Sequence, residues 1–140
     1  MCAGAALIAL SQLNTPLVKV NSHYPVDAIT HAEALGLVGP GHRLVAQDVV
    51  GNYLEGRYGT SASVFIDDRY DMHPKSLVVD YADLLGGRPN WAEILDRHQA
   101  EAVLWEPKLP LASLLLESPD WRVVYVDKSW LLFVRTTRSW

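Results

Sequence analysis

The stretch Val64-Phe65-Ile66-Asp67-Asp68-Arg69-Tyr70-Asp71 passes abruptly from apolar residues to a cluster of charged ones. β-Branched and aromatic residues in a short apolar run are typical of a buried strand, so we expect a strand over residues 63–67. Open α/β sheets bind their ligands at the carboxyl ends of parallel strands, where this strand would place its acidic residues. The stretch therefore indicates both a fold class and a candidate site.

Helices and strands are expected to alternate on both sides of this stretch. The patterns predict helices over 25–36, 48–58, 74–85 and from Pro110, strands over 43–47 and 102–105, and an antiparallel hairpin of 121–126 with 130–135. A further helix is expected to begin at Asn90, which would form a capping box with Glu93. Strands that alternate with helices imply a parallel sheet with right-handed crossovers.

The predicted fold class is therefore α/β. We expect a three-layer, Rossmann-like mixed sheet of about five strands, mostly parallel, with the C-terminal hairpin forming an antiparallel edge. The chain has 140 residues, which is the length of one domain and enough to fold without disulfides or a metal. We assign residues 25–140 to that single domain and residues 14–24 to a connector.

Composition excludes some partners. The formal net charge is −4 and no basic stripe is present, so no nucleic-acid partner is expected. Cys2 is the single cysteine and has no partner for an intrachain disulfide. The sequence thus leaves the redox compartment open.

The N-terminal segment 1–13 allows two interpretations. Residues 1–10 carry no charged side chain, but a spanning helix needs about 20 apolar residues. A signal peptide would begin with basic residues, which are missing here. The segment is therefore either an apolar N-terminal helix or the end of a transmembrane helix.

The acidic cluster also allows two interpretations. Asp67, Asp68, Arg69, Asp71 and His73 could bind a divalent cation or a phosphosugar, with Tyr53 on the same contact surface. Against a shared metal, successive residues of a strand point to opposite faces, which would separate the first two carboxylates. The simpler interpretation is a buried Asp–Arg pair that fixes the loop before the helix at Pro74.

Other patterns that carry chemistry are missing from the sequence. The five histidines are scattered, without the spacing of a metalloprotease helix. Neither a nucleophile elbow nor a phosphate-binding loop occurs. Four of the tryptophans fall at inward positions and are expected in the core. We therefore expect no catalytic residue, no resident metal and no cofactor in this chain.

Three places carry a resemblance to a known family. Gly51-Asn52-Tyr53-Leu54 is similar to a "GGYL" turn, and residues 64–71 are similar to a "VFIDGRxD" strand end. Residues 91–125 resemble a closing stretch "W…LDRY…AVL…PLA…WRVVY". Together they resemble the C-terminal soluble domain of actinobacterial polytopic membrane proteins related to GT-C glycosyltransferases. Asn52 and Asp68 stand where that family usually has glycine.

This resemblance implies an extracytoplasmic location at the cell membrane. Segment 1–13 would then be the end of the last transmembrane helix, and the membrane-embedded remainder of the parent protein would be the partner. The domain would be a non-catalytic accessory module that binds a glycan or a polyprenyl-phosphate sugar, or that mediates assembly.

Two other functions remain as alternatives. One is a free-standing, metal-dependent α/β hydrolase that acts on phosphate or sugar esters through Asp67, Asp68 and Asp71. The other is a structural interaction module whose hairpin edge pairs with another chain.

Overall fold

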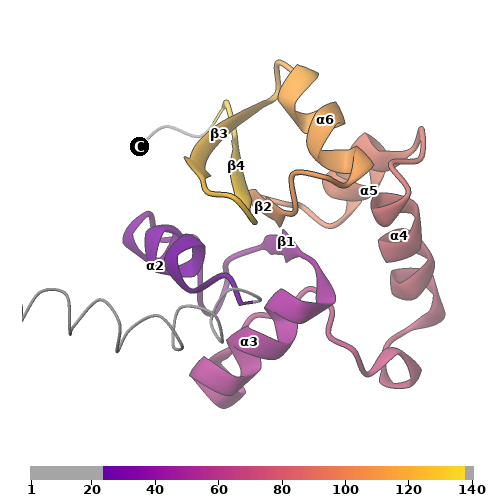
Figure 1. The fold of residues 1–140 in the computed structure, drawn as a ribbon. Helices are drawn as coiled ribbons and strands as arrows, with labels where there is room; N and C mark the ends of the chain where they lie inside the picture. Colours follow the sequence, from indigo (N-terminus) through magenta and orange to yellow (C-terminus); the bar gives the residue numbers. More distant parts are fainter. Residues whose placement is uncertain (1–23, 138–140) are drawn as a thin grey trace, which may run out of the picture.

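A computed structural model describes residues 24–137, in which five helices pack around a four-stranded mixed sheet (Figure 1). The helices are α2 (Val26–Ala34), α3 (Asp48–Tyr58), α4 (Lys75–Leu85), α5 (Trp91–Arg97) and α6 (Pro110–Glu117). The strands are β1 (Leu44–Ala46), β2 (Ala102–Trp105), β3 (Trp121–Val126) and β4 (Leu131–Arg135). Two short 3-10 turns, η1 (Gly59–Ser61) and η2 (Tyr70–Met72), complete the described elements.

The predicted N-terminal segment 1–13 and all but the last residue of the predicted connector lie outside the described residues. Within residues 24–137, none of the helices combines the length and the apolar character needed to span a bilayer.

The strand order is β1-β2-β4-β3. β1 and β2 run parallel, and β4 pairs antiparallel with both β2 and β3. The C-terminal hairpin is confirmed, with an irregularity between Val123 and Tyr125. The α/β class is also confirmed, but the sheet has four strands rather than about five, and only one of its three strand pairs is parallel.

Both faces of the sheet are covered, because neighbouring residues of each central strand are buried on opposite sides. Val103 of β2 joins a core with α4, α5 and α6, while Leu104 joins a second core with α2 and α3. Strands buried on both faces have continuous apolar runs, which is why β1, β2 and β4 were readable from sequence. The core tryptophans Trp105, Trp121 and Trp130 are buried, as predicted.

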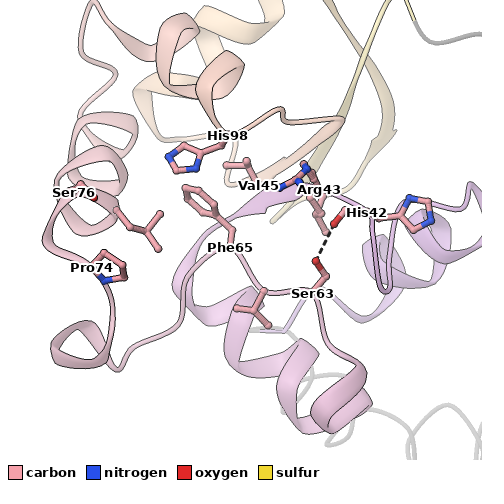
Figure 2. Close-up of a pocket in the computed structure, with 11 residues that line it drawn as sticks. His42, Arg43, Val45, Ser63, Phe65, Pro74, Ser76 and His98 are labelled. Carbon is pink, nitrogen blue, oxygen red and sulfur yellow. Dashed lines mark hydrogen bonds between the residues drawn. The ribbon is translucent and has the colours of Figure 1, made fainter.

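The prediction of a strand over residues 63–67 is wrong. This segment, which we call the edge segment (residues 62–69), belongs to no strand, and β1 pairs with β2 alone. Its polar groups are bonded by side chains instead. Ser63 Oγ donates to the His42 carbonyl at 2.9 Å (Figure 2), and the Asp68 amide donates to Asn52 Oδ1 at 3.4 Å. These bonds replace the regular ladder that a fifth strand requires.

The predicted capping box at Asn90 is also absent. The Asn90 side chain makes no cap hydrogen bond to α5. Its Nδ2 donates instead to Asp83 Oδ2 at 3.0 Å, and this bond links the end of α4 to the start of α5. The Asn90 side chain therefore forms a tertiary hydrogen bond in place of the local helix cap that the sequence pattern predicts.

Gly51 lets α3 approach the edge segment closely. A Cβ atom placed on Gly51 would lie 1.9 Å from the Ile66 carbonyl oxygen. That oxygen belongs to the backbone, so it cannot move aside as a flexible side chain would. The close approach positions the first turns of α3 directly beside the charged cluster that follows Ile66.

We expect Gly51→Ala to lower the free energy of unfolding by about 2 kcal/mol, because the added methyl group overpacks the contact with Ile66. Gly56→Ala, in the same helix, is the matched control. A Cβ on Gly56 meets nothing within 4 Å, so it should raise stability by roughly 0.5–1 kcal/mol through helix propensity. Urea denaturation of both variants measures the difference. Equal effects would contradict the packing argument.

Candidate functional site

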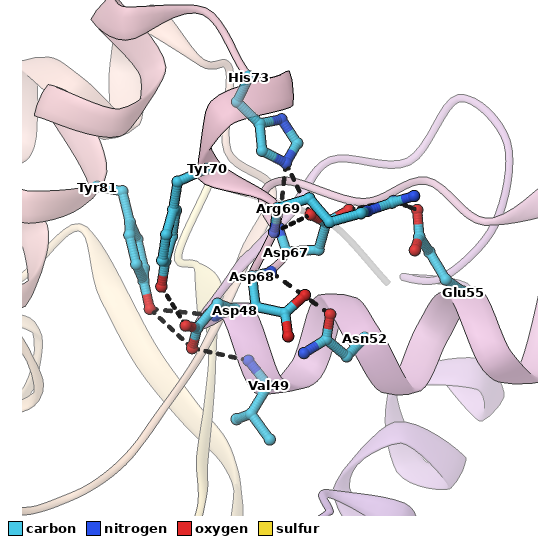
Figure 3. Close-up of polar contacts among 10 residues, drawn as sticks. All are labelled: Asp48, Val49, Asn52, Glu55, Asp67, Asp68, Arg69, Tyr70, His73 and Tyr81. Carbon is cyan, nitrogen blue, oxygen red and sulfur yellow. Dashed lines mark hydrogen bonds and ion pairs between the residues drawn. The ribbon is translucent and has the colours of Figure 1, made fainter.

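Asp67 is the centre of the candidate site. Its side chain is only 2% exposed, and three hydrogen bonds reach its carboxylate (Figure 3). Oδ1 accepts from the Arg69 amide at 2.9 Å and faces His73 Nε2 at 3.0 Å, while Oδ2 accepts from Arg69 Nη2 at 2.5 Å. The predicted Asp–Arg pair before the α4 helix is therefore present.

His73 adds a contact from beyond the η2 turn. Its Nε2 atom lies 3.0 Å from Asp67 Oδ1 and 3.4 Å from the Asp67 amide nitrogen. One ring nitrogen cannot donate to the first and accept from the second in the same tautomer. We assign the hydrogen bond to the shorter contact, with the ring donating to the carboxylate.

Arg69 connects the buried carboxylate to the surface. Its Nη2 atom also donates to Glu55 Oε1 of α3, so one guanidinium nitrogen serves two carboxylates. The Arg69 hydrogen bonds hold the pKa of Asp67 well below its usual range, although burial opposes this shift. The two neighbouring carboxylates in turn raise the pKa of Arg69.

A second polar cluster fixes the η2 turn to the start of α3. Tyr70 and Tyr81 both donate to the carboxylate of Asp48, the first to Oδ2 and the second to Oδ1 at 3.2 Å (Figure 3). Burial and the bond to Asp48 raise the pKa of Tyr70 to about 12, so this tyrosine is a donor at neutral pH. The cluster holds the loop on the side opposite to Arg69.

This second cluster lies at the carboxyl ends of the two parallel strands. Asp48 follows β1, and Glu106 follows β2. The Gln47 side chain bridges the two strand ends, because its Oε1 accepts from the Glu106 amide at 2.8 Å and its Nε2 donates to Glu106 Oε1 at 3.1 Å. α3 and α6 then leave for opposite faces of the sheet, an arrangement typical of ligand crevices in open α/β sheets. In this protein the Gln47 and Glu106 side chains bridge the crevice.

A pocket of about 420 Å³ lies between α3 and the edge segment. Its polar lining is made by Glu55, Asp67, Arg69 and His73, and residues in and around η1 also line it. Glu55 and Arg69 are 38% and 51% exposed, so both reach solvent from fixed positions. The pocket therefore offers acceptors and donors held close together.

The structure separates the five residues predicted to bind a ligand. Asp67 and Arg69 line this pocket. The Asp68 amide is bonded to Asn52, and Asp71 is exposed in η2. Tyr53 lies elsewhere, because its ring is 5.7 Å from the ring of Tyr24 and therefore faces the start of α2.

Sequence reasoning missed Glu55 and Asp48 as members of the two polar clusters. Both belong to α3, whose approach to the edge segment depends on tertiary packing at Gly51. Asp68 also has no positive φ; Gln99 is the one residue other than glycine with that conformation among residues 24–137. An aspartate at position 68 is thus accommodated by ordinary backbone geometry.

The three carboxylates of the proposed metal-dependent hydrolase do not converge. Asp67 is held by Arg69 and His73, whereas Asp71 is exposed on the turn beyond. Within the described part of the chain, no group of three or more His, Cys, Asp and Glu side chains is arranged to hold a metal ion.

No protein-family model, curated protein or solved structure matches the chain.

We expect Asp67→Asn to lower the free energy of unfolding by about 2 kcal/mol at neutral pH, because Arg69 and His73 lose a buried anionic acceptor. The loss stays below that of a fully buried ion pair because Arg69 is half exposed. Asp71→Asn makes the same change on an exposed carboxylate and should leave stability unchanged. Chemical denaturation of the two variants tests this, and equal stability would refute a structural role for Asp67.

Stability is also expected to fall in acid. The pKa of Asp67 is lowered in the folded protein from about 3.9 in the unfolded chain. The ionised carboxylate therefore stabilises the fold fully above the unfolded value, and this contribution is lost as the pH falls towards the folded value. The stability difference between wild type and Asp67→Asn should shrink below about pH 4. A difference independent of pH would contradict the assignment.

Proposed function

We propose that the chain is a non-catalytic accessory domain of a membrane glycosyltransferase-like protein. It would lie on the extracytoplasmic side of the cell membrane, beside the membrane-embedded remainder of its parent. Its role would be to bind a glycan, or the sugar of a polyprenyl-phosphate donor, in the pocket formed by Glu55, Asp67, Arg69 and His73. The observation that carries this proposal is the Asp67 carboxylate, which accepts three hydrogen bonds from its own loop and has a lowered pKa.

A carboxylate that acts as a general acid or base needs a pKa near the working pH and a free lone pair aimed at the substrate. Asp67 lacks the first property because its pKa is lowered. Arg69 and His73 also occupy most of its lone pairs, leaving one site on Oδ2. The same contacts disfavour the metal-dependent hydrolase, which would require Asp67 to coordinate a cation. A fixed polar wall without a reactive group is better suited to binding than to catalysis.

The pocket wall suits hydroxyl groups. Glu55 supplies a carboxylate acceptor and Arg69 supplies N–H donors, and their ion pair sets the distance between them. Neighbouring sugar hydroxyls need donors and acceptors side by side. Because the ion pair to Asp67 already restrains the guanidinium, little additional ordering is needed on binding. Met72, 74% exposed at the same pocket, adds an apolar surface for the face of a sugar ring.

Sugar binding is tested by titrating the full chain with methyl glycosides and an isoprenyl-phosphate sugar, followed by amide NMR. We expect saturable shifts at residues 59–62, Arg69 and His73. Glu55→Gln should weaken the response about tenfold through the loss of one charge-assisted hydrogen bond. Glu33→Gln is the matched control, since Glu33 pairs with Arg57 outside the pocket.

Three outcomes would contradict the proposal. If none of the sugars shifts the amide signals, the chain does not have the proposed sugar-binding role. A rise in melting temperature with Mg²⁺ or Mn²⁺ that is lost in Asp67→Asn would favour the hydrolase instead. In cells that carry the native gene, an antibody to this chain should label the membrane fraction and the surface of intact cells. Recovery solely from the cytoplasm would contradict the assigned location.

A further inference from the structure

A second pocket, of about 370 Å³, lies on the other side of the edge segment (Figure 2). It is bordered by the start of β1, the edge segment, the start of α4 and the end of α5, and we call it the β1-edge pocket. Its lining combines apolar, hydroxyl and basic side chains from these four places: His42, Arg43, Leu44, Val45, Ser63, Val64, Phe65, Pro74, Ser76, Leu77 and His98. Its volume is within the range of pockets that hold small molecules.

The pocket exists because the edge segment does not pair with β1. The Glu101 amide donates to the Arg43 carbonyl on the β2 side. Because amide directions alternate along a strand, the Leu44 amide points to the outer side, where no strand pairs with β1 among the described residues. Ser63 Oγ satisfies the outward carbonyl of His42. Space and an unpaired strand edge are thus left beside Leu44.

One side of this pocket is apolar and well fixed. The rings of Phe65 and His98 meet edge to face with their centroids 5.1 Å apart (Figure 2). His98 is held in turn by Asp80, whose Oδ2 lies 2.7 Å from His98 Nε2. Val45 and Leu77 belong to the core on this face or pack against it. An aromatic or branched apolar group would find a preformed surface here.

The other side of the pocket is basic. No aspartate or glutamate lines it, although the chain has a net charge of −4. The pocket at Asp67 and a third pocket beside Arg135 both contain carboxylates. Arg43 is exposed at the β1-edge pocket and forms no ion pair with any residue of the described range 24–137. His42 stands next to it, with its Nδ1 3.4 Å from Glu101 Oε2.

The carboxylates of Asp80 and Glu101 already have partners of their own. Asp80 accepts from Arg97 Nη2 at 2.7 Å in addition to its contact with His98. Glu101 faces His42. An anion placed at Arg43 would therefore meet a guanidinium that pairs with no carboxylate of the described residues, and guanidinium groups form strong, bidentate hydrogen bonds with carboxylates and phosphates.

We propose that the β1-edge pocket binds a small organic anion that carries an apolar group, with the anionic group at Arg43 and the apolar group against Phe65. The anionic group is a carboxylate or a phosphate ester, since a guanidinium pairs with both. The outward amide of Leu44 supplies an additional donor beside Arg43. This site is independent of the proposed sugar-binding pocket, because the two have different polar walls.

The test is an amide NMR titration of the full chain with three probes of similar size. Phenylacetate and phenyl phosphate represent the two anions, and phenylacetamide is the neutral counterpart. We expect shifts at Leu44, Phe65, Leu77 and His98 with at least one anion. Phenylacetamide should bind at least about tenfold more weakly than that anion. The stronger of the two anions identifies the headgroup.

Arg43→Gln should weaken anion binding about tenfold, and in the free protein it should shift only the amide signals of its immediate neighbours, since Arg43 is exposed. Arg88→Gln removes an arginine that lines none of the pockets described above and serves as the matched control. The proposal is overturned if neither anion shifts these residues. It is equally overturned if phenylacetamide binds as well as the anions, or if Arg43→Gln binds them as wild type does.

Discussion

The burial of the Asp67 carboxylate is the constraint from which the arrangement around the edge segment follows. A carboxylate removed from water must be fully hydrogen-bonded or it destabilises the fold. Arg69 and His73 satisfy this one, and both come from the same short loop. The loop is therefore held by hydrogen bonds to its own carboxylate, and this fixes the position at which α4 begins. Arg69 extends the same network to Glu55 and so to α3.

The close contact at Gly51 is the packing counterpart of this network. Glu55 of α3 can reach Arg69 only because the first turns of α3 lie against the Ile66 carbonyl without an intervening side chain. Together the two contacts draw the edge segment towards α3 and away from a regular pairing with β1. Together with the Ser63–His42 and Asp68–Asn52 hydrogen bonds, these contacts explain why residues 62–69 form no strand.

The displaced edge segment divides the surface into two pockets of different character. Val64 borders both of them. On one side the wall contains two carboxylates, Glu55 and Asp67, and on the other it contains Arg43 and no acid. One loop thus separates a polar pocket that contains carboxylates from a partly apolar pocket that contains an arginine. The two sites can be tested separately because no charged residue belongs to both.

The sequence by itself determined the elements whose signals are local. Continuous apolar runs identified β2 and β4, proline and glycine marked helix ends, and the Asp67–Arg69 pair was readable because its members are two residues apart. Tertiary structure decided what depended on distant partners. Residues 63–67 have the composition of a strand, but Asn52, Gly51 and His42 determine where that segment runs. Glu55 and Arg43 became candidate binding residues only once packing brought α3 and the β1 edge beside the same loop.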